Sequence, residues 1–157
     1  MHVLSQDLKL EKNIESYADS IKKGTHRFIT FQVQRGKLGL NWLYSFKYLM
    51  NKPVFIYRES SYQNTLIVQE FYFKNGKMIY SEERLVTYHG NDSSTWEGYY
   101  YFVNGKFYSS KTMGHGKSEN DRWNPKTEVL RNFMECRADI SKYYKSKSTS
   151  ANTGLLK

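Results

Sequence analysis

The sequence predicts an α+β fold: a single antiparallel β-meander of about six or seven strands with an N-terminal and a C-terminal helix packed on one face. Three observations lead to this fold class. Both ends of the chain show amphipathic helical patterns, whereas the middle alternates apolar and polar residues with a period of two. Two Asn-Gly dipeptides, Asn75-Gly76 and Asn104-Gly105, interrupt the alternating region as hairpin turns do.

Composition indicates one domain over residues 1–145, followed by a flexible C-terminal tail over residues 146–157. The chain has 157 residues, of which 39% are hydrophobic and 17% aromatic, which is enough for a packed core and typical of β-structure. Its lone cysteine, Cys136, excludes an internal disulfide. No apolar run is long enough for a transmembrane helix.

The first helix is expected over residues 5–23, with Ser5 or Asp7 as its N-cap and Gly24 just after its end. Its apolar stripe comprises Leu10, Ile14, Tyr17 and Ile21. The second helix is expected over residues 124–145, where Asn124 suits the N-cap and Pro125 the first helical position. Its stripe comprises Val129, Phe133, Cys136 and Ile140.

The strands between the helices follow from alternation and from a repeat. Residues 27–33 alternate as a strand does, and residues 72–77 recur as residues 101–106, each copy ending in Asn-Gly-Lys. Residues 38–50 fit either a strand or a helix. The strand is favoured because this run feeds a third, weaker turn-like segment at residues 51–53.

Hairpin geometry assigns the side chains to two faces. A two-residue turn at each Asn-Gly places one set of rings on an inner, apolar face: Phe71, Phe73, Met78, Tyr80, Tyr100, Phe102 and Phe107. The opposite face then carries tyrosines and lysines. Two helices can cover only one face, so we expect this second face to remain open.

The open face supplies the candidate binding residues. They are Tyr72, Trp96, Tyr99, Tyr101 and Tyr108. Tyrosine offers a large apolar contact and a hydroxyl, which suits a protein or polysaccharide partner. The alternative is that a homodimer or a helix buries this face.

Residues 54–57 and 70–79 resemble the repeated "YYF-x-NGK" β-hairpins of small secreted or periplasmic bacterial proteins, over roughly residues 40–110. The resemblance implies an antiparallel meander and an extracytoplasmic location, and it carries no catalytic or binding residues. Residues 1–7 lack the basic and apolar regions of a signal peptide. The protein is therefore either cytoplasmic or a mature form without its leader, and the resemblance favours a periplasmic or secreted location.

Other functions are weaker alternatives to a non-enzymatic binding module. The net charge of +9 suits a polyanion or nucleic acid, yet the sequence has no dense basic block. A hydrolase would need paired carboxylates, for which the candidates are Glu82, Glu83, Asp92 and Glu97. The four histidines, His2, His26, His89 and His115, lack the spacing of metal ligands, and no nucleotide-binding motif is present. No catalytic residue, metal or cofactor is therefore assigned.

Overall fold

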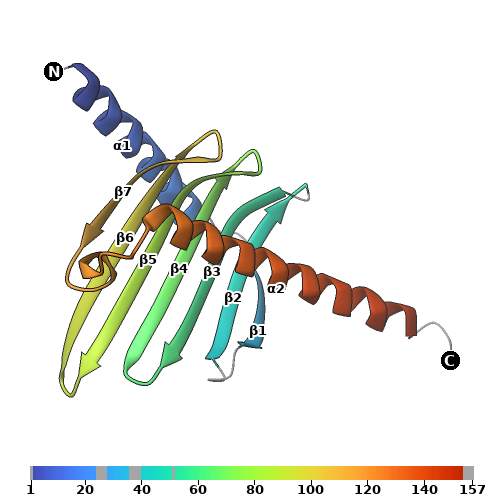
Figure 1. Ribbon diagram of the computed structural model, residues 1–157. Coiled ribbons are helices and arrows are strands. Elements are labelled where there is room, and N and C mark those ends of the chain that lie inside the picture. Colours follow the sequence, from blue (N-terminus) through green and yellow to red (C-terminus); the bar gives the residue numbers. More distant parts are fainter. Residues whose placement is uncertain (1, 24–27, 36–39, 51, 154–157) are drawn as a thin grey trace.

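The protein forms one seven-stranded antiparallel sheet between two helices, and its fold class is the predicted α+β (Figure 1). The computed structural model describes residues 2–23, 28–35, 40–50 and 52–153. The chain runs through α1 (His2–Lys23), β1 (Ile29–Arg35), β2 (Leu40–Leu49), β3 (Lys52–Tyr62), β4 (Thr65–Lys74), β5 (Lys77–His89), β6 (Asp92–Val103), β7 (Lys106–Met113), a 3-10 turn (Lys117–Glu119) and α2 (Pro125–Thr153). Each strand pairs with its neighbours in sequence, so the sheet is an unbroken meander.

The strand interpretation of residues 38–50 is confirmed for the part that the structure describes, because β2 pairs with both β1 and β3. Residues 38 and 39, and Arg27 of the first predicted strand, lie outside the described residues. Both Asn-Gly turns are confirmed as well. Asn75 and Gly76 have φ of 54° and 77°, and Asn104 and Gly105 have φ of 53° and 80°, as a type I′ turn requires.

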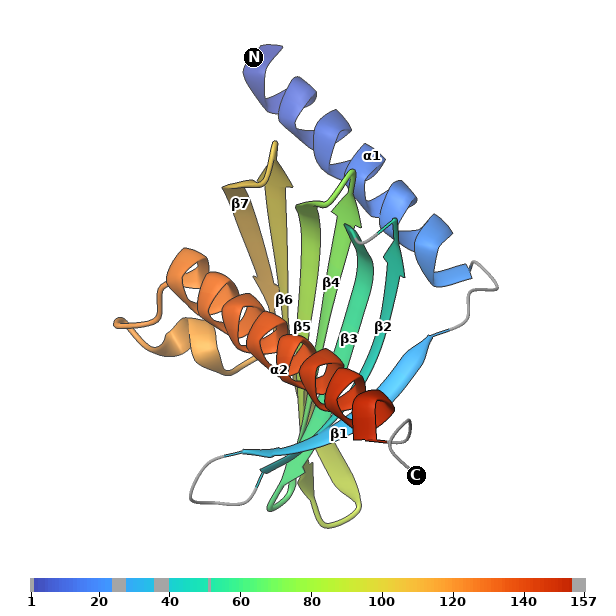
Figure 2. The same cartoon turned by 90° about the vertical axis from the view of Figure 1, so that its right-hand side faces the viewer.

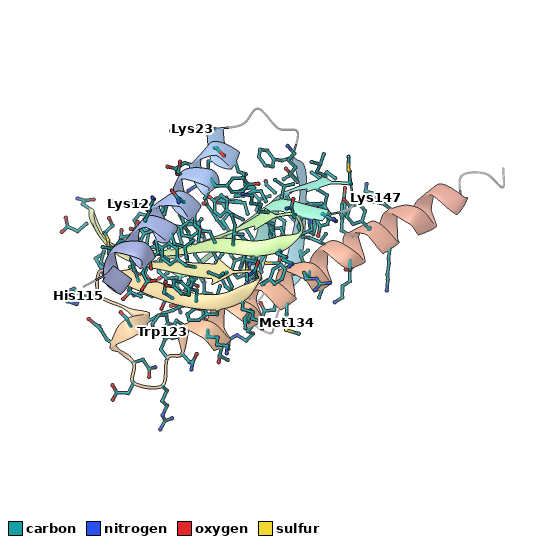
Figure 3. The ribbon with its side chains drawn as sticks, turned by 90° about the horizontal axis from the view of Figure 1, so that it is seen from above. Lys12, Lys23, His115, Trp123, Met134 and Lys147 are labelled. Carbon is teal, nitrogen blue, oxygen red and sulfur yellow. The ribbon has the colours of Figure 1, made fainter. Side chains whose placement is uncertain are left out.

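The two helices pack on opposite faces of the sheet, so the prediction that both lie on one face is wrong. Phe71 packs in the core beneath α2, and its neighbour Tyr72 packs beneath α1. Adjacent residues of a strand point to opposite faces, so the helices must lie on opposite faces too. Figure 3 shows the sheet lying between them, and Figure 2 shows α2 crossing the strands obliquely. The physical reason is that both faces carry enough aromatic surface to need a cover.

The core beneath α2 is the larger one. It joins Trp42, Tyr44, Phe46, Ile56, Phe71, Phe73, Met78, Tyr100 and Phe102 to Val129, Cys136 and Ile140 of α2. The core beneath α1 joins Phe55, Tyr72, Tyr80 and Tyr101 to Ile14, Ala18 and Ile21. Cys136 is fully buried, as its place on the apolar stripe predicts.

A bulge explains the one error in the predicted inner face. Tyr72 pairs with Tyr80, but Phe73 pairs with Met78, so the register shifts by one residue between them. Tyr80 consequently joins Tyr72 beneath α1, and Ser81 takes the place beside Phe71. The bulge supplies the extra residue that reverses the faces from that point.

The helix ends differ from the predicted ones. Asn124 is the N-cap of α2 as expected, because its Oδ1 accepts the backbone N–H of Thr127 at 3.0 Å. The helix continues to Thr153, so the predicted boundary at residue 145 is wrong, and residues 154–157 of the expected tail lie outside the described residues. At the other end α1 begins at His2, so neither Ser5 nor Asp7 is its N-cap, and Gly24 lies outside the described residues.

Candidate functional site

The predicted tyrosine surface is not open. Tyr72 and Tyr101 are 0% and 1% exposed beneath α1. Trp96 is also buried, but on the opposite face, where its ring meets that of Trp123 and its Nε1 donates to Ser118. Only Tyr99 and Tyr108 remain accessible in part. The surface is closed because α1 covers it, which is the alternative cover that the sequence left open.

The phenol hydroxyls of this face donate hydrogen bonds to carboxylates of the same chain. Tyr57 donates to Glu59, Tyr72 to Glu70 and Tyr99 to Glu97, each two residues away on the same strand. Tyr101 and Tyr108 donate to Glu15 and Asp7 of α1. Burial and the Glu97 carboxylate raise the pKa of Tyr99 to about 12, so the phenol stays protonated and donates at neutral pH. The Tyr101 and Tyr108 pairs therefore tie α1 to the sheet, and the other pairs satisfy the phenols within their own strands.

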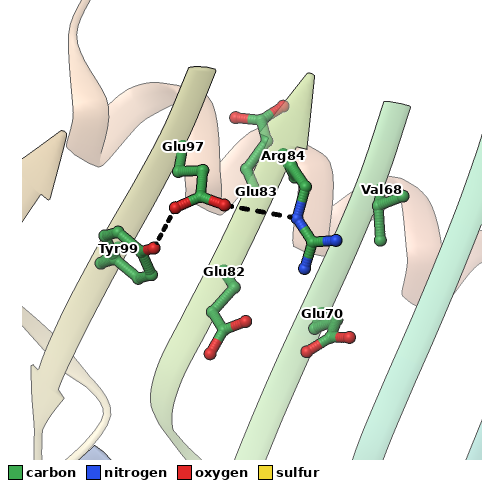
Figure 4. Close-up of a pocket in the computed structure, with 7 residues that line it drawn as sticks. All are labelled: Val68, Glu70, Glu82, Glu83, Arg84, Glu97 and Tyr99. Atoms are coloured by element: carbon green, nitrogen blue, oxygen red, sulfur yellow. Dashed lines mark hydrogen bonds and ion pairs between the residues drawn. The ribbon is translucent and has the colours of Figure 1, made fainter. Parts of the chain in front are cut away.

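Carboxylates gather beyond the end of α1, in a hollow shown in Figure 4. Its lining comprises Val68, Glu70, Glu82, Glu83, Arg84, Glu97 and Tyr99. Lys22 of α1 bridges Glu70 at 2.7 Å and Glu82 at 3.0 Å. Burial and the neighbouring Glu70 charge nevertheless raise the pKa of Glu82.

This hollow has a volume of about 20 Å³, which is room for a single water. Of the four carboxylates considered for hydrolysis, Glu82 and Glu97 both point into it (Figure 4). The Glu83 carboxylate reaches the opposite face, where Tyr100 donates to it at 3.1 Å. Asp92 lies at the far end of β6. The structure therefore does not gather the four carboxylates at one substrate-sized cavity.

A buried polar network connects the other face of the sheet to α2. Arg58 is 1% exposed, lies 4.2 Å from the centre of the Trp42 ring, and donates through Nε to Gln69 at 2.6 Å. Gln69 donates in turn to Glu83 at 2.6 Å, and Lys117 pairs with the same carboxylate at 2.7 Å. Arg58 also pairs with Glu135 of α2 at 3.3 Å, so each buried charge is matched, as burial requires. This network serves to hold α2 in register on the sheet.

Three hairpin turns lie side by side at one end of the strands, because in a meander every second turn lies at the same end of the sheet. We call this the turn edge and define it by the described residues 49–50, 52–53, 74–77 and 103–106. A lysine stands directly after each turn, at Lys52, Lys77 and Lys106, and all three are exposed. Neighbouring turns are two strands apart, so the three lysine positions form a row with a spacing of about 10 Å.

The row of cations is not neutralised. The turn edge contains a fourth lysine, Lys74, and no acidic residue. Among the residues that the structure describes, Lys52, Lys77 and Lys106 form no ion pair. The stem of Lys52 lies against Gly76, and that of Lys77 lies near Gly105, so each lysine rests on the next turn.

Apolar side chains stand exposed between these lysines. Met50 is 89% exposed, Leu49 60% and Val103 37%. Exposing large apolar side chains to water at the tip of a hairpin costs free energy, and a cluster of them commonly marks a contact surface. The turn edge thus combines uncompensated positive charge with exposed apolar surface.

The lysines of the turn edge were missed as site residues in the sequence. Lys77 and Lys106 end the two sequence repeats, and these repeats by themselves predict only hairpins. The useful signal was topological. Because the two Asn-Gly turns alternate with other turns in a meander, the residues that follow them must share an edge.

The described residues contain no group of three or more His, Cys, Asp or Glu side chains placed to hold a metal ion. His89 and His115 are exposed and contact Ser94 and Glu119, and His26 lies outside the described residues. No described helix is both long and apolar enough to span a membrane. Comparison of the chain with known protein families, with curated proteins and with solved structures gives no match.

Proposed function

We propose that the protein is a non-enzymatic binding module that docks on an anionic lipid surface through its turn edge. The observation that carries the proposal is the row of Lys52, Lys77 and Lys106 beside the exposed Leu49 and Met50. The proposal keeps the binding role that the sequence favoured. It moves the contact from the tyrosine face, which α1 covers, to the turn edge, where Lys52, Lys77 and Lys106 are exposed.

The charge of the row is suited to such a surface. A lysine close to an anionic bilayer contributes about 1 kcal/mol, so three of them contribute about 3 kcal/mol together. The row is held by a rigid sheet, since Lys52 and Lys77 rest on neighbouring turns. All three ammonium groups can therefore reach one plane without ordering a loop first.

The apolar tip favours lipid over a polar polyanion. Met50 and Leu49 project from the end of the β2–β3 hairpin, 89% and 60% exposed. Side chains of this kind gain free energy when they enter the boundary between headgroups and acyl chains. A nucleic acid or an acidic polysaccharide would pair with the lysines but would leave Met50 exposed to water. Stacking on bases would need exposed rings, which the turn edge lacks.

The test is sedimentation with vesicles of mixed phosphatidylglycerol and phosphatidylcholine. Replacing the three lysines together (K52Q/K77Q/K106Q) is expected to weaken binding by roughly a hundredfold, the loss of about 3 kcal/mol. Binding of the unmodified protein should be weak on pure phosphatidylcholine and should fall as salt rises.

The matched control removes the same charge elsewhere. Lys12 of α1 and Lys126 and Lys142 of α2 are exposed and lie outside the turn edge, so K12Q/K126Q/K142Q should lower binding by only a few fold. Equal losses in the two triple variants would show that net charge, not the turn edge, governs binding. Tighter binding to a single-stranded oligonucleotide than to the vesicles would also overturn the proposal.

A further inference from the structure

A large hollow lies between the turn edge and α2, on the face of the sheet that α2 covers. Its volume is about 500 Å³, within the range of sites that hold small organic ligands. Its lining comprises Tyr48, Pro53, Phe73, Gly76, Lys77, Met78, Asn104, Gly105, Leu130, Phe133 and Arg137. Four separate parts of the chain therefore build it: the β2–β3 hairpin, the two Asn-Gly hairpins and one flank of α2.

The floor of the hollow and its wall on the α2 side are apolar, whereas the two Asn-Gly turns line the rest with polar groups. Phe73 and Met78 are 2% and 5% exposed and form the buried floor. Leu130, Phe133 and Tyr48 are half-buried and stand around it. The Phe133 ring lies 5.3 Å from that of Phe73, so the wall of α2 is packed directly on the floor. This apolar side of the hollow is suited to an alkyl chain.

Two cations flank the apolar lining. The Arg137 guanidinium lies 5.9 Å from the centre of the Phe133 ring and is exposed. Lys77 comes from the Asn75-Gly76 turn and forms no ion pair with any described residue. No acidic side chain lines the hollow. The charge of the site therefore selects a ligand with an anionic head.

We infer that this hollow binds a single alkyl chain that ends in an anionic group, such as a fatty carboxylate. The chain contacts Phe73, Met78, Leu130 and Phe133, and the head pairs with Arg137 and Lys77. This site differs from the docking surface, since it takes one amphiphile from solution and needs no bilayer. It shares only Lys77 with the row of lysines.

The test is a fluorescence titration with dansyl-undecanoic acid in the absence of vesicles. The protein should bind this probe, and dodecanoate should displace it about tenfold more effectively than dodecanol, because a charge-assisted contact is worth roughly 1.5 kcal/mol or more. No binding by the unmodified protein, or equal displacement by the alcohol, would refute the inference.

Two variants locate the probe. Leu130→Trp fills the hollow from α2 and should weaken binding at least about tenfold, and Arg137→Gln should weaken it about tenfold. Leu8→Trp, at a 53% exposed position on α1, is the control for an added ring and should change nothing. Circular dichroism would confirm that each variant is folded. Unchanged probe binding in both Leu130→Trp and Arg137→Gln would place the probe elsewhere.

A further variant separates the two proposals. K52Q/K106Q alters the turn edge without touching the lining of the hollow. It should lose vesicle binding and keep probe binding if both proposals hold. Retained vesicle binding with normal probe binding would refute the docking proposal alone. Failure of the probe to bind any form of the protein would refute the hollow alone.

Discussion

The two ends of the sheet have the same backbone architecture, but the turns that the structure describes at each end differ in charge. At the turn edge, each of three hairpins is followed by a lysine that has no ion pair among the described residues. At the opposite edge, the two described turns, at Gln63 and at Gly90, bring no lysine or arginine. The meander therefore dictates where turns lie, and the residues beside them decide which edge can meet an anionic partner.

The opposite edge also satisfies its own polar groups. The backbone N–H of Tyr88 donates to the carbonyl of Asn64 at 2.8 Å, and the Asn64 side chain donates back to the Tyr88 carbonyl at 2.7 Å. These two bonds connect the β3–β4 turn to the end of β5. The turn edge has cations that extend into solvent instead. The described turns of the opposite end therefore carry no cation, and the β3–β4 turn bonds to the end of β5, whereas the lysines of the turn edge form no ion pair with a described residue.

Two sets of variants test this comparison, and the larger effect is expected from replacing the exposed apolar residues of the β2–β3 hairpin. L49S/M50S is expected to weaken vesicle binding about tenfold, since each side chain loses part of the free energy of entering the bilayer interface. Met113→Ser is the matched control, because Met113 is 60% exposed at the end of β7 near the opposite edge. Sedimentation with anionic vesicles should show no loss for this control. Equal losses at both edges would contradict the account.

A smaller effect is expected from matched glycines. Gly76 and Gly90 have φ of 77° and 66°, so alanine at either position should lower the free energy of unfolding by about 1 kcal/mol. A Cβ at Gly76 would lie 3.3 Å from the stem of Lys52, whereas one at Gly90 would meet nothing. Because both sites have positive φ and the exposed Lys52 stem can move aside, denaturant unfolding should give similar losses for both variants.

Vesicle binding should separate these two glycine variants. Gly76→Ala displaces Lys52 and should weaken binding about twofold to threefold, whereas Gly90→Ala should leave binding unchanged. A larger loss of vesicle binding in Gly90→Ala would count against the importance of the lysine row.

Much of the fold could be predicted because its signals are local. Asn-Gly turns need positive φ, and alternation needs a strand, so two hairpins and the class of the fold followed from short segments. Which face of the sheet α1 covers could not be predicted from local signals. Tyr72 and Tyr101 looked like solvent-facing tyrosines, yet their rings are as well suited to a helix as to water.

The bulge and the site were harder to predict for related reasons. One extra residue on β5, between Met78 and Tyr80, moves Tyr80 to the other face, and no residue type in this segment predicts the bulge. The lysines of the turn edge are far apart in sequence, at positions 52, 77 and 106, so no dense basic block marks them. Only the order of the strands brings them together. A periplasmic or secreted location stays a prediction from the hairpin resemblance.

The orientation of the protein on a vesicle tests the central claim most directly. Met50 and Gln63 occupy turns at opposite edges and have similar φ, 49° and 51°, so Met50→Cys and Gln63→Cys are matched labelling sites. The native Cys136 is buried and should not react. With a nitrobenzoxadiazole label and anionic vesicles, we expect a brighter, blue-shifted emission at position 50 and no change at position 63. An equal change at both positions, or a change at position 63 alone, would contradict docking through the turn edge.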